Sequence, residues 1–273
     1  MIPALRERIL RLARVPPPAE CTTLLVGGVA CGRVQPAAAR LLAQGGRGLR
    51  LVDGALATDT ASASGEDHSR CLLEAAQALV EAGLAGPWRH ELLAVRPAAD
   101  EPALAHVDRC VVRILGITTH SVHLNGYAPG GRMIVSRRSP AKRVDPGLWD
   151  TLAGGMVASG ESALLALARE AWEEAGLDLE GHEILAGGRM LVERPVSEGH
   201  LCEWLEIFDV YVPEPEKLAN QDGEVDTIEL RTLDEILSGI DAGAFTVEAA
   251  LSIFDSVERR GSSRESARGF SLT

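Results

Sequence analysis

The pattern of apolar and polar positions predicts two consecutive units built from both helices and strands. In the first unit, apolar residues recur at helical spacing or fill short runs bounded by glycine and proline, which are the marks of helices and strands. The expected helices lie at 2–13, 36–42 and 68–82, and the expected strands at 22–29, 49–52 and 92–95. We therefore expect residues 1–115 to form a small N-terminal α/β domain.

The second unit is expected to combine several strands with one strong central helix and a terminal helix. Strands are expected at 120–127, 132–136, 189–193, 205–212 and 227–230, and helices at 162–175, 234–238 and 247–259. Strands interleaved with helices in this order favour a mixed sheet covered by helices, an α/β sandwich. We expect this domain to span 116–261 and the polar residues 262–273 to form a flexible tail.

The net charge of the chain limits the partners that it can bind. The 273 residues carry a formal charge of −12, and such a chain is poorly suited to bind nucleic acid, whose backbone requires clustered lysine and arginine. A hydrophobic share of 46% and a charged share of 24% are typical of a globular protein with a sizeable core. An acidic chain can still bind a small phosphorylated ligand when metal ions supply the positive charge.

The five cysteines are widely spaced, and none forms a C-x-x-C pair. Such a set is typical of reduced thiols in a reducing compartment rather than of a disulfide or zinc framework. The N-terminal segment lacks an uninterrupted apolar signal core, and no apolar stretch approaches the length needed to span a membrane. These features lead us to expect a cytoplasmic protein with no membrane partner.

The segment from Gly155 to Leu177 contains the residues that we expect to carry the chemistry. Ser159 or Ser162 can cap the start of its helix, and Gly176 supplies the conformational freedom for the end. The apolar residues expected to share one face and pack on a sheet are Leu164, Leu167, Ala168 and Ala171.

Three glutamates of this helix are spaced so that they share another face. Glu170, Glu173 and Glu174 lie three or four residues apart, so their carboxylates converge. Carboxylates packed together repel one another, and a cation removes this cost. Hard carboxylate oxygens suit Mg²⁺ or Mn²⁺, which keep water ligands and share phosphate oxygens of a substrate. Taken alone, however, such a cluster is more often a solvated acidic surface.

The wider spacing around these glutamates resembles the Nudix box, G-x5-E-x7-R-E-U-x-E-E-x-G-U, in which U is a bulky apolar residue. The matching residues are Gly155, Glu161, Arg169, Glu170, Glu173, Glu174, Gly176 and Leu177, with Ala171 where a larger residue is preferred. The resemblance implies a Nudix α/β/α sandwich with a mixed sheet, preceded by the small N-terminal domain. It also implies a metal-dependent hydrolase that acts on acid anhydrides, as a diphosphatase or pyrophosphatase.

The resemblance implies roles for the individual residues of the box. Glu170 and Glu174 are expected to be metal ligands, with Glu173 joining them or binding a second ion. Arg169 and Glu161 are expected to support them by orienting the catalytic loop. The resemblance thus implies a catalytic helix whose carboxylates hold a cation against a diphosphate.

Two further features stand on either side of the box. The adjacent glycines Gly154 and Gly155 let the backbone approach a ligand without a side-chain clash, although an ordinary turn explains them equally well. Glu224 follows Gly223 in a loop, and many Nudix enzymes use a later glutamate as general base or further metal ligand. The alternative for Glu224 is a solvated loop charge.

Candidates for substrate binding precede the box. Arg137, Arg138 and Lys142 form a compact basic cluster that is able to grip a terminal phosphate, although an exposed hairpin end is the other interpretation. Trp149 could stack on an aromatic heterocycle, but a tryptophan beside a strand more often belongs to the core. The expected partner is therefore a small-molecule diphosphate.

A wider likeness points to one group of Nudix proteins, those related to thiamine pyrophosphokinase, which carry an extra N-terminal domain. The segments that carry it are 87–91, 123–127, 137–142, 146–150, 220–225 and 243–245. Members of this group are associated with hydrolysis of damaged, oxidised thiamine diphosphate to the monophosphate. The implied reaction is attack of water on the diphosphate, with release of orthophosphate. Asp150 and Thr151 depart from the Asp-Asn pair expected in that group. The resemblance therefore does not identify the residues that contact the ring of the substrate.

Several alternatives stay open beside this hypothesis. The same enzyme class could act on a nucleoside diphosphate derivative, such as ADP-ribose, a sugar nucleotide or a dinucleotide. Isopentenyl diphosphate isomerases share the fold but need a cysteine before the box helix, and no cysteine lies between Cys110 and Cys202. A non-catalytic module that senses a ligand tends to lose box glutamates, and none is lost here. The N-terminal domain is expected either to cover the substrate or to build a homodimer.

Overall fold

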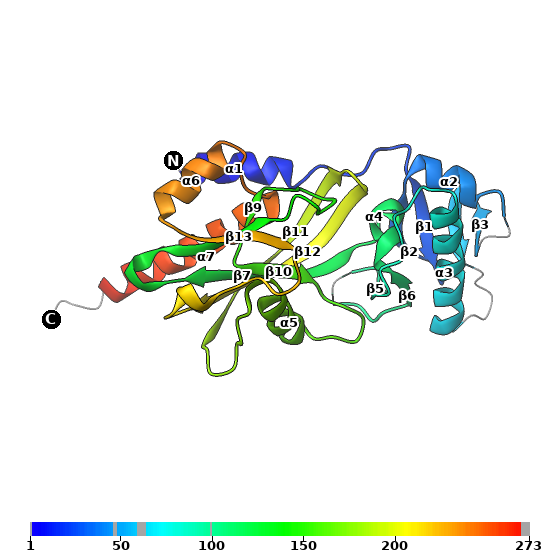
Figure 1. The fold of residues 1–273 in the computed structure, drawn as a ribbon. Coiled ribbons are helices and arrows are strands. Elements are labelled where there is room, and N and C mark those ends of the chain that lie inside the picture. Colours follow the sequence, from blue (N-terminus) through cyan, green and yellow to red (C-terminus); the bar gives the residue numbers. More distant parts are fainter. Residues whose placement is uncertain (1, 46–47, 59–63, 99, 269–273) are drawn as a thin grey trace.

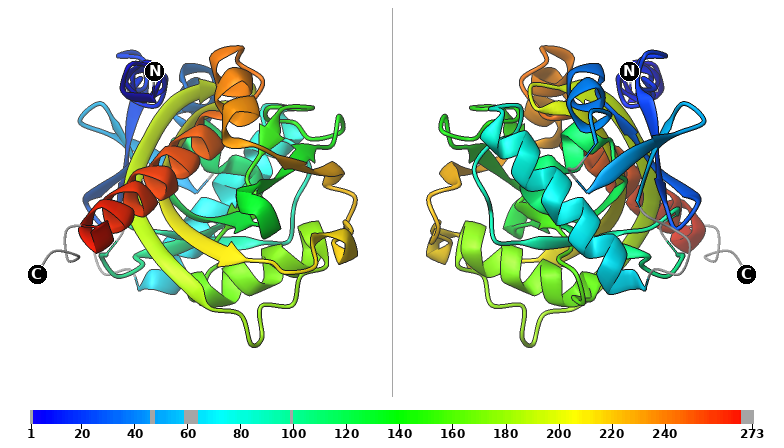
Figure 2. Two further views of the ribbon diagram at one scale, coloured as in Figure 1. Left: turned by 90° about the vertical axis from the view of Figure 1, so that its left-hand side faces the viewer. Right: turned by 90° about the vertical axis from the view of Figure 1, so that its right-hand side faces the viewer.

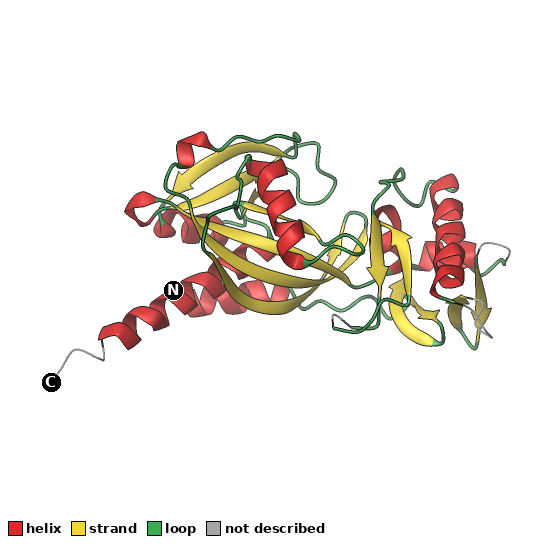
Figure 3. Ribbon diagram, turned by 90° about the horizontal axis from the view of Figure 1, so that it is seen from below, coloured by secondary structure: helices red, strands yellow, loops and turns green. Residues whose placement is uncertain are grey.

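Two units of helices and strands lie side by side in the computed structural model of the chain (Figure 1). The structure describes residues 2–45, 48–58, 64–98 and 100–268, with the backbone alone described for 262–268. The N-terminal unit comprises residues 22–115, and the C-terminal unit comprises residues 119–268 together with the first helix, residues 2–12. Figure 3 shows the long curved strands of the C-terminal unit beside the smaller N-terminal unit.

The N-terminal unit contains a four-stranded sheet, a two-stranded hairpin and three α-helices. Its sheet has the order β2-β1-β4-β3, in which β1 pairs in parallel with β4 and the other pairs are antiparallel. The strands are β1 (Thr22–Val26), β2 (Val29–Val34), β3 (Leu49–Val52), β4 (Ala55–Thr58), β5 (Leu92–Val95) and β6 (Ala105–Asp108). The helices are α2 (Pro36–Leu42), α3 (Gly65–Glu81) and α4 (Val112–Leu115), with the 3-10 helix η1 (Arg109–Val111) before α4. One buried cluster joins the sheet, α3 and the β5–β6 hairpin.

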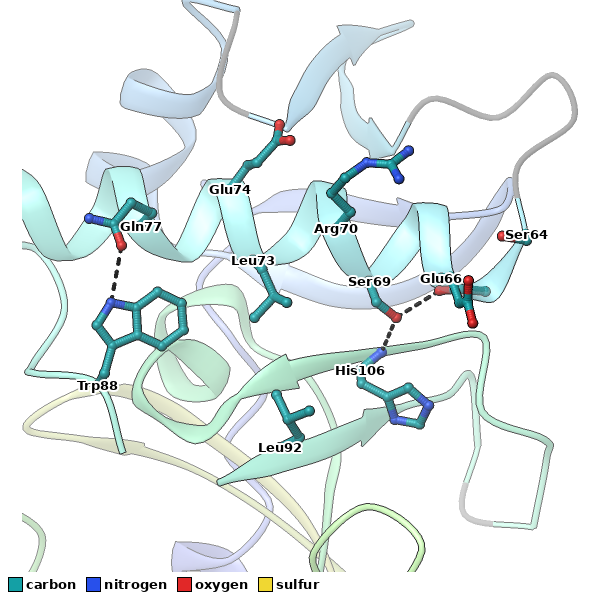
Figure 4. Close-up of a pocket in the computed structure, with 11 residues that line it drawn as sticks. Ser64, Glu66, Ser69, Arg70, Leu73, Glu74, Gln77, Trp88, Leu92 and His106 are labelled. Carbon is teal, nitrogen blue, oxygen red and sulfur yellow. Dashed lines mark hydrogen bonds between the residues drawn. The ribbon is translucent and has the colours of Figure 1, made fainter. Parts of the chain in front are cut away.

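Helix α3 lies along the β5–β6 hairpin, and a shallow groove of about 1020 Å³ runs between them (Figure 4). The start of α3 is fixed by a capping box, in which Ser64 and Asp67 bond each other's backbone N–H. The Ser69 hydroxyl accepts the N–H of His106 at 2.9 Å, and the Trp88 indole donates to Gln77 at 3.1 Å. These bonds tie the hairpin and the segment before it to the helix.

The C-terminal unit is built on a curved mixed sheet. Its main order is β11-β12-β7-β8-β13, with β10 paired to β7 and β9 paired to β8. The β12–β7 pair is parallel, and the other pairs are antiparallel. The strands are β7 (Thr119–Tyr127), β8 (Met133–Arg138), β9 (Trp149–Asp150), β10 (Ala153–Met156), β11 (Ile184–Val196), β12 (Gly199–Tyr211) and β13 (Val225–Arg231). Short 3-10 helices are η2 (Pro129–Gly131) and η3 (Pro215–Lys217).

Helices cover both faces of this sheet. Helix α5 (Ala163–Ala175) packs on one face, in a buried cluster with residues of β7, β10 and β12. Helix α7 (Val247–Arg268) crosses the other face together with α6 (Leu233–Asp241) and α1 (Ile2–Leu12), as Figure 2 shows. The expected α/β/α sandwich with a mixed sheet is therefore confirmed, and so is the small α/β region before it.

The structure agrees with most of the elements expected from the sequence and adds five strands. Strands β2, β4, β6, β9 and β10 were not expected, because each is at most six residues long and lacks a clear alternation of apolar and polar residues. Helix α7 continues to Arg268, past the expected end at 259, whereas 269–273 lie outside the described residues. The division of the chain at residues 115 and 116 stays a prediction. Helix α1 packs against α7 and thus belongs to the core of the C-terminal unit.

In the part of the chain that the structure describes, no helix is both long enough and apolar enough to cross a lipid bilayer.

The loop that precedes α5 is bonded to the hairpin of the N-terminal unit. The backbone N–H of Ser159 donates to the carbonyl of Leu92 at 2.7 Å. The Ser159 hydroxyl lies 2.6 Å from Nδ1 of His106, within hydrogen-bond distance. Two residues of β5 and β6 therefore hold one residue of this loop.

A buried ion pair also joins the two units. Arg113 of α4 contacts Glu203 of β12 at 3.1 Å, and both side chains are at most 10% exposed. The Thr119 hydroxyl donates to the same Glu203 oxygen at 3.0 Å. Burial alone would raise the pKa of Glu203, but the charge of Arg113 outweighs it and holds the pKa below its ordinary value. The contribution of this ionised carboxylate to stability is therefore present at neutral pH and is lost as the pH falls through the lowered pKa.

Replacing one residue of this ion pair should lower the stability of the fold, because the other charge then stays buried without a partner. We expect Arg113→Met to destabilise the chain by about 3–5 kcal/mol, because it leaves a buried carboxylate without a cation. The double variant Arg113→Met/Glu203→Leu should recover most of that loss, since no charge then stays buried. Urea unfolding followed by circular dichroism measures both, and an unchanged midpoint in the single variant would contradict the argument.

Candidate active site

Helix α5 holds the glutamates of the candidate site, and both of its ends are fixed by the local sequence. At its start, the Ser162 side chain accepts the backbone N–H of Leu165 at 3.3 Å. At its end, Gly176 adopts the left-handed conformation with a φ of 62° and bonds back into the last turn. Ser162, and not Ser159, is therefore the N-cap of α5, and Gly176 ends this helix as expected.

The face of α5 that packs on the sheet is rotated from the one expected. Leu167 and Ala171 are buried, as expected, but Leu164 is 59% exposed and Ala168 is also exposed. Ala166 and Ala175 are buried as well, and their small side chains let the helix lie close to the sheet. The buried side of the helix also carries two of the three glutamates, Glu170 and Glu174.

Glu170 is buried against a glycine of β10. A Cβ atom added at Gly155 would lie only 2.1 Å from Oε1 of Glu170, so no larger residue leaves the carboxylate in this position. The Arg169 guanidinium donates to the same oxygen at 2.7 Å. Burial and the nearby charge of Glu174 raise the pKa of Glu170 to about 7, although Arg169 and Arg109 act in the opposite direction.

Glu174 lies one turn further along and is also buried. It accepts hydrogen bonds from Lys142 Nζ at 3.0 Å and from the backbone N–H of Gly154 at 3.0 Å. Burial raises the pKa of Glu174, and the charge of Lys142 offsets only part of this effect. Lys142 also contacts the carboxylate of Glu224. Burial would raise the pKa of Glu224 as well, but there Lys142 outweighs it and the pKa is lowered.

Arg169 connects α5 with the loop before it. Its Nε and Nη2 atoms each donate to Glu161 at 3.0 Å, and Nη2 also donates to the carbonyl of Met156 at 3.1 Å. Its Nη1 atom donates to Glu173 at 3.1 Å. Glu161 in turn accepts the backbone N–H of Ala158 at 3.1 Å. These bonds link Arg169 and Glu161 to both ends of the loop 156–161.

These side chains border a polar cavity of about 750 Å³ that both units line. Its walls in the C-terminal unit include Arg138, Lys142, Gly154, Gly155, Arg169, Glu170, Glu173 and Glu224. Its walls in the N-terminal unit include Arg89, Glu91, Arg109, Cys110 and Arg113. Glu161 and Glu174 are not on the wall itself and contact it through Arg169 and Lys142. The predicted site residues are thus largely gathered around one cavity.

Two predicted substrate contacts lie elsewhere. Arg137 is exposed and donates to the carbonyl of Gly147 at 3.2 Å, without lining the cavity. Trp149 packs with the core beneath α7, and the guanidinium of Arg231 lies 3.7 Å from the centre of its ring. This placement gives no support to stacking of Trp149 on a substrate ring and agrees with the alternative of a core tryptophan.

The site offers the donor chemistry of a divalent cation, although its acidic side chains are turned toward cations of the chain. Among the described residues, no three side chains of His, Cys, Asp or Glu form a ready cluster of ligands. Glu170 and Glu174 are nevertheless buried close enough for the charge of one to raise the pKa of the other. Two buried carboxylates one helical turn apart fit a hard cation that prefers oxygen ligands.

No pattern in the sequence predicted which residues of the N-terminal unit line the cavity. Arg89 and Glu91 fall in the segment 87–91, whose likeness to a protein family was apparent, but no pattern placed them at the glutamates. Cys110 also lines the cavity, and burial together with Asp108 raises the pKa of its thiol to about 12. The thiol is therefore protonated at neutral pH, which does not favour the isomerase alternative.

Comparison with protein families gives a match to the NUDIX domain over residues 122–250. Residues 122–250 belong to the Nudix superfamily. The matched segment contains most of β7, the box residues from Gly155 to Leu177 and most of the sheet that supports α5. The resemblance of the box is thereby confirmed for the segment that carries the buried glutamates.

Two relatives from Arabidopsis thaliana align over most of the chain. Nudix hydrolase 20, chloroplastic, is 27% identical over 80% of this chain and 60% of its own length. Nudix hydrolase 24, chloroplastic, is 26% identical over 75% of this chain and 58% of its own length. The chain thus spans somewhat over half the length of these two relatives.

Among solved structures, the chain is similar to the crystal structure of DR0079 from Deinococcus radiodurans. The two have 20% identity and a TM-score of 0.49, and the match covers 60% of this chain and 97% of that one.

Gly155 gives a test of the close packing in the Nudix site. We expect Gly155→Ala to displace the Glu170 carboxylate, because the added Cβ overlaps it, and to weaken the binding of a divalent cation by about tenfold or more. The melting temperature should change little, since the displaced group is the end of a flexible side chain. Calorimetric titration with Mn²⁺ measures the affinity.

The matched control is Gly261→Ala on α7, where an added Cβ meets no atom within 4 Å. If Gly155→Ala bound the cation with wild-type affinity, the position of Glu170 against β10 would not be required for cation binding.

Proposed function

We propose that the chain hydrolyses a phosphoanhydride bond in a small organic diphosphate, with Mg²⁺ or Mn²⁺ as cofactor. The observation that carries this proposal is the burial of Glu170 and Glu174 beside Gly155, within a Nudix domain and next to a cavity large enough for a small ligand. Buried carboxylates with raised pKa values are typical of functional sites rather than of solvated helix surfaces.

The proposed reaction is attack of a water oxygen on the terminal phosphorus. The new P–O bond forms as the bond to the bridging oxygen breaks, so an organic monophosphate and orthophosphate leave. When bound at Glu170 and Glu174, a divalent cation supplies positive charge to the phosphoryl oxygens and makes water easier to deprotonate. Glu173, at the cavity edge, is available to a second ion.

The remaining roles fall to residues around these carboxylates. Arg169 positions the loop 156–161 and the Glu170 carboxylate through its hydrogen bonds. Lys142 pairs with both Glu174 and Glu224. We assign acceptance of the water proton to Glu224, because its lowered pKa keeps it ionised and its side chain is 51% exposed.

For the organic part of the substrate, we propose a damaged thiamine diphosphate, which is converted to the monophosphate. Support comes from the likeness of segments between residues 87 and 245 to proteins related to thiamine pyrophosphokinase. The cavity lining in the described structure contains no Phe, Tyr or Trp, so binding rests mainly on contacts to the phosphates. The cytoplasmic location and the homodimer expected from the sequence stay predictions.

A substrate panel tests this assignment. Oxidised thiamine diphosphates, thiamine diphosphate, ADP-ribose and a sugar nucleotide are incubated with the full chain and Mg²⁺, and phosphate release is measured. We expect the oxidised thiamine diphosphates to have the highest kcat/KM and EDTA to abolish turnover until Mg²⁺ or Mn²⁺ is restored. Faster cleavage of the nucleotide derivatives would replace thiamine with a nucleoside diphosphate derivative as the substrate.

A single substitution separates an enzyme from a module that only binds. Glu174→Gln removes one buried charge while it keeps the shape, and we expect kcat to fall by about a hundredfold or more. Circular dichroism and the melting temperature check that the fold is retained. Glu180→Gln, an exposed glutamate just after the same helix, is the matched control and should retain activity. Full turnover in Glu174→Gln would refute the assigned role of this residue.

A further inference from the structure

Nearly every cationic side chain that lines the cavity is already paired with a carboxylate of the chain. This matters because a phosphate ligand needs positive charge that is not fully used elsewhere. The pairs are Arg109–Glu91, Arg113–Glu203, Arg138–Asp150, Lys142 with Glu174 and Glu224, Arg143–Glu198, Arg169 with Glu161, Glu170 and Glu173, and Arg194 with Asp145 and Glu248.

Arg89 is the exception among the described residues of the lining. Its guanidinium forms no ion pair and no side-chain hydrogen bond in the described structure, and the residue is exposed at the cavity wall. Its charge acts on the thiol of Cys110, which lines the same cavity. The N-terminal unit thus places the unpaired guanidinium of Arg89 at the cavity that borders the catalytic carboxylates.

The backbone that carries Arg89 is held in place by a buried aspartate. Asp108 is 1% exposed, and its carboxylate accepts the N–H groups of Arg89 at 3.1 Å, His90 at 2.9 Å and Cys110 at 2.9 Å. His90 has a φ of 58°, which is unfavourable for a residue with a side chain. Such a conformation is strained and persists only where surrounding bonds impose it.

The neighbours of Arg89 are fixed as well. The Trp88 indole donates to Gln77 on α3, as Figure 4 shows. Glu91 accepts from the Arg109 side chain at 2.8 Å, and its carbonyl accepts the Arg109 backbone N–H at 2.9 Å. The segment 88–91 is therefore rigid, whereas the Arg89 side chain that it presents is free to bind.

Arg109 extends the positive charge toward the catalytic residues. It lines the cavity together with Glu170 and Glu224, and its positive charge acts on both carboxylates from across the boundary between the units. The cationic wall of the N-terminal unit therefore faces the acidic wall of the Nudix domain. A ligand that carries two phosphoryl groups and a cation matches both walls.

We propose that Arg89, on its rigid turn, binds the terminal phosphoryl group of the substrate, so that the preferred substrates are diphosphates with one free end. A guanidinium presents two parallel donors, and a terminal phosphoryl group offers more unsubstituted oxygens to them than an internal one. The inference rests on the proposed function for the identity of the ligand as a diphosphate. It gives the N-terminal unit a direct part in substrate binding.

Kinetics of Arg89→Ala test the specificity. With an organic diphosphate that has a free terminal phosphate, we expect KM to rise by about tenfold or more and kcat to change little, because a charged hydrogen-bond donor is lost from binding. Arg89→Lys should restore part of the affinity, since it restores the charge but not the paired donors. With a diphosphate substituted at both ends, KM should change much less.

The control variant is Arg132→Ala, an exposed arginine in the turn between β7 and β8 that does not line the cavity. It should behave as wild type. An unchanged KM in Arg89→Ala, or an equal rise for both classes of substrate, would overturn the proposal.

A binding measurement keeps this inference separate from the catalytic one. Inorganic pyrophosphate is titrated into the full chain by calorimetry without divalent metal, and Arg89→Ala should weaken binding by about tenfold or more at an unchanged melting temperature. If the wild type binds pyrophosphate through Arg89 but hydrolyses no diphosphate, the proposed function fails and the inference stands. If the wild type hydrolyses diphosphates and Arg89→Ala binds and turns over normally, the inference fails and the proposed function stands.

Discussion

The arrangement of the site depends on one electrostatic constraint, the burial of two carboxylates on the same helix. Removing a carboxylate from water costs several kcal/mol even after the protein relaxes, and two close together also repel. Arg169 and Lys142 offset part of this cost, but the pKa values of Glu170 and Glu174 stay raised. The chain thus keeps negative charge where water cannot fully stabilise it. The close approach to Gly155 and the capped ends of α5 maintain this unfavourable placement.

The sequence predicted the parts of the structure that follow from local spacing. The helix of the Nudix box was expected within one residue of its observed start, and Gly176 as its end, because caps and helical periodicity are local properties. The orientation of that helix was not predicted, since Leu164 is exposed where a packed residue was expected. Which face meets a sheet depends on the size of residues on both partners, here alanines that allow close approach. Periodicity alone does not contain that information.

The candidate site was predictable in its glutamates but not in its cations. Arg138 and Lys142 line the cavity, whereas Arg137, which neighbours them in sequence, points elsewhere, because successive residues of a strand face opposite sides of the sheet. Arg89 and Arg109 belong to the N-terminal unit. No sequence motif predicts how that unit is positioned relative to the Nudix domain. Contacts between distant segments, such as the Arg113–Glu203 pair, set that position, and they become visible only in the folded chain.

The contact between Ser159 and the β5–β6 hairpin has a consequence for how far the molecule can be shortened. Leu92 and His106 hold the loop at the head of α5, so a recombinant fragment that began after residue 115 would lose both anchors of that loop. The excised fragment would keep every box residue and still have a looser loop before α5. The segment that matches the NUDIX domain, residues 122–250, is thus shorter than the smallest fragment in which the loop retains these contacts.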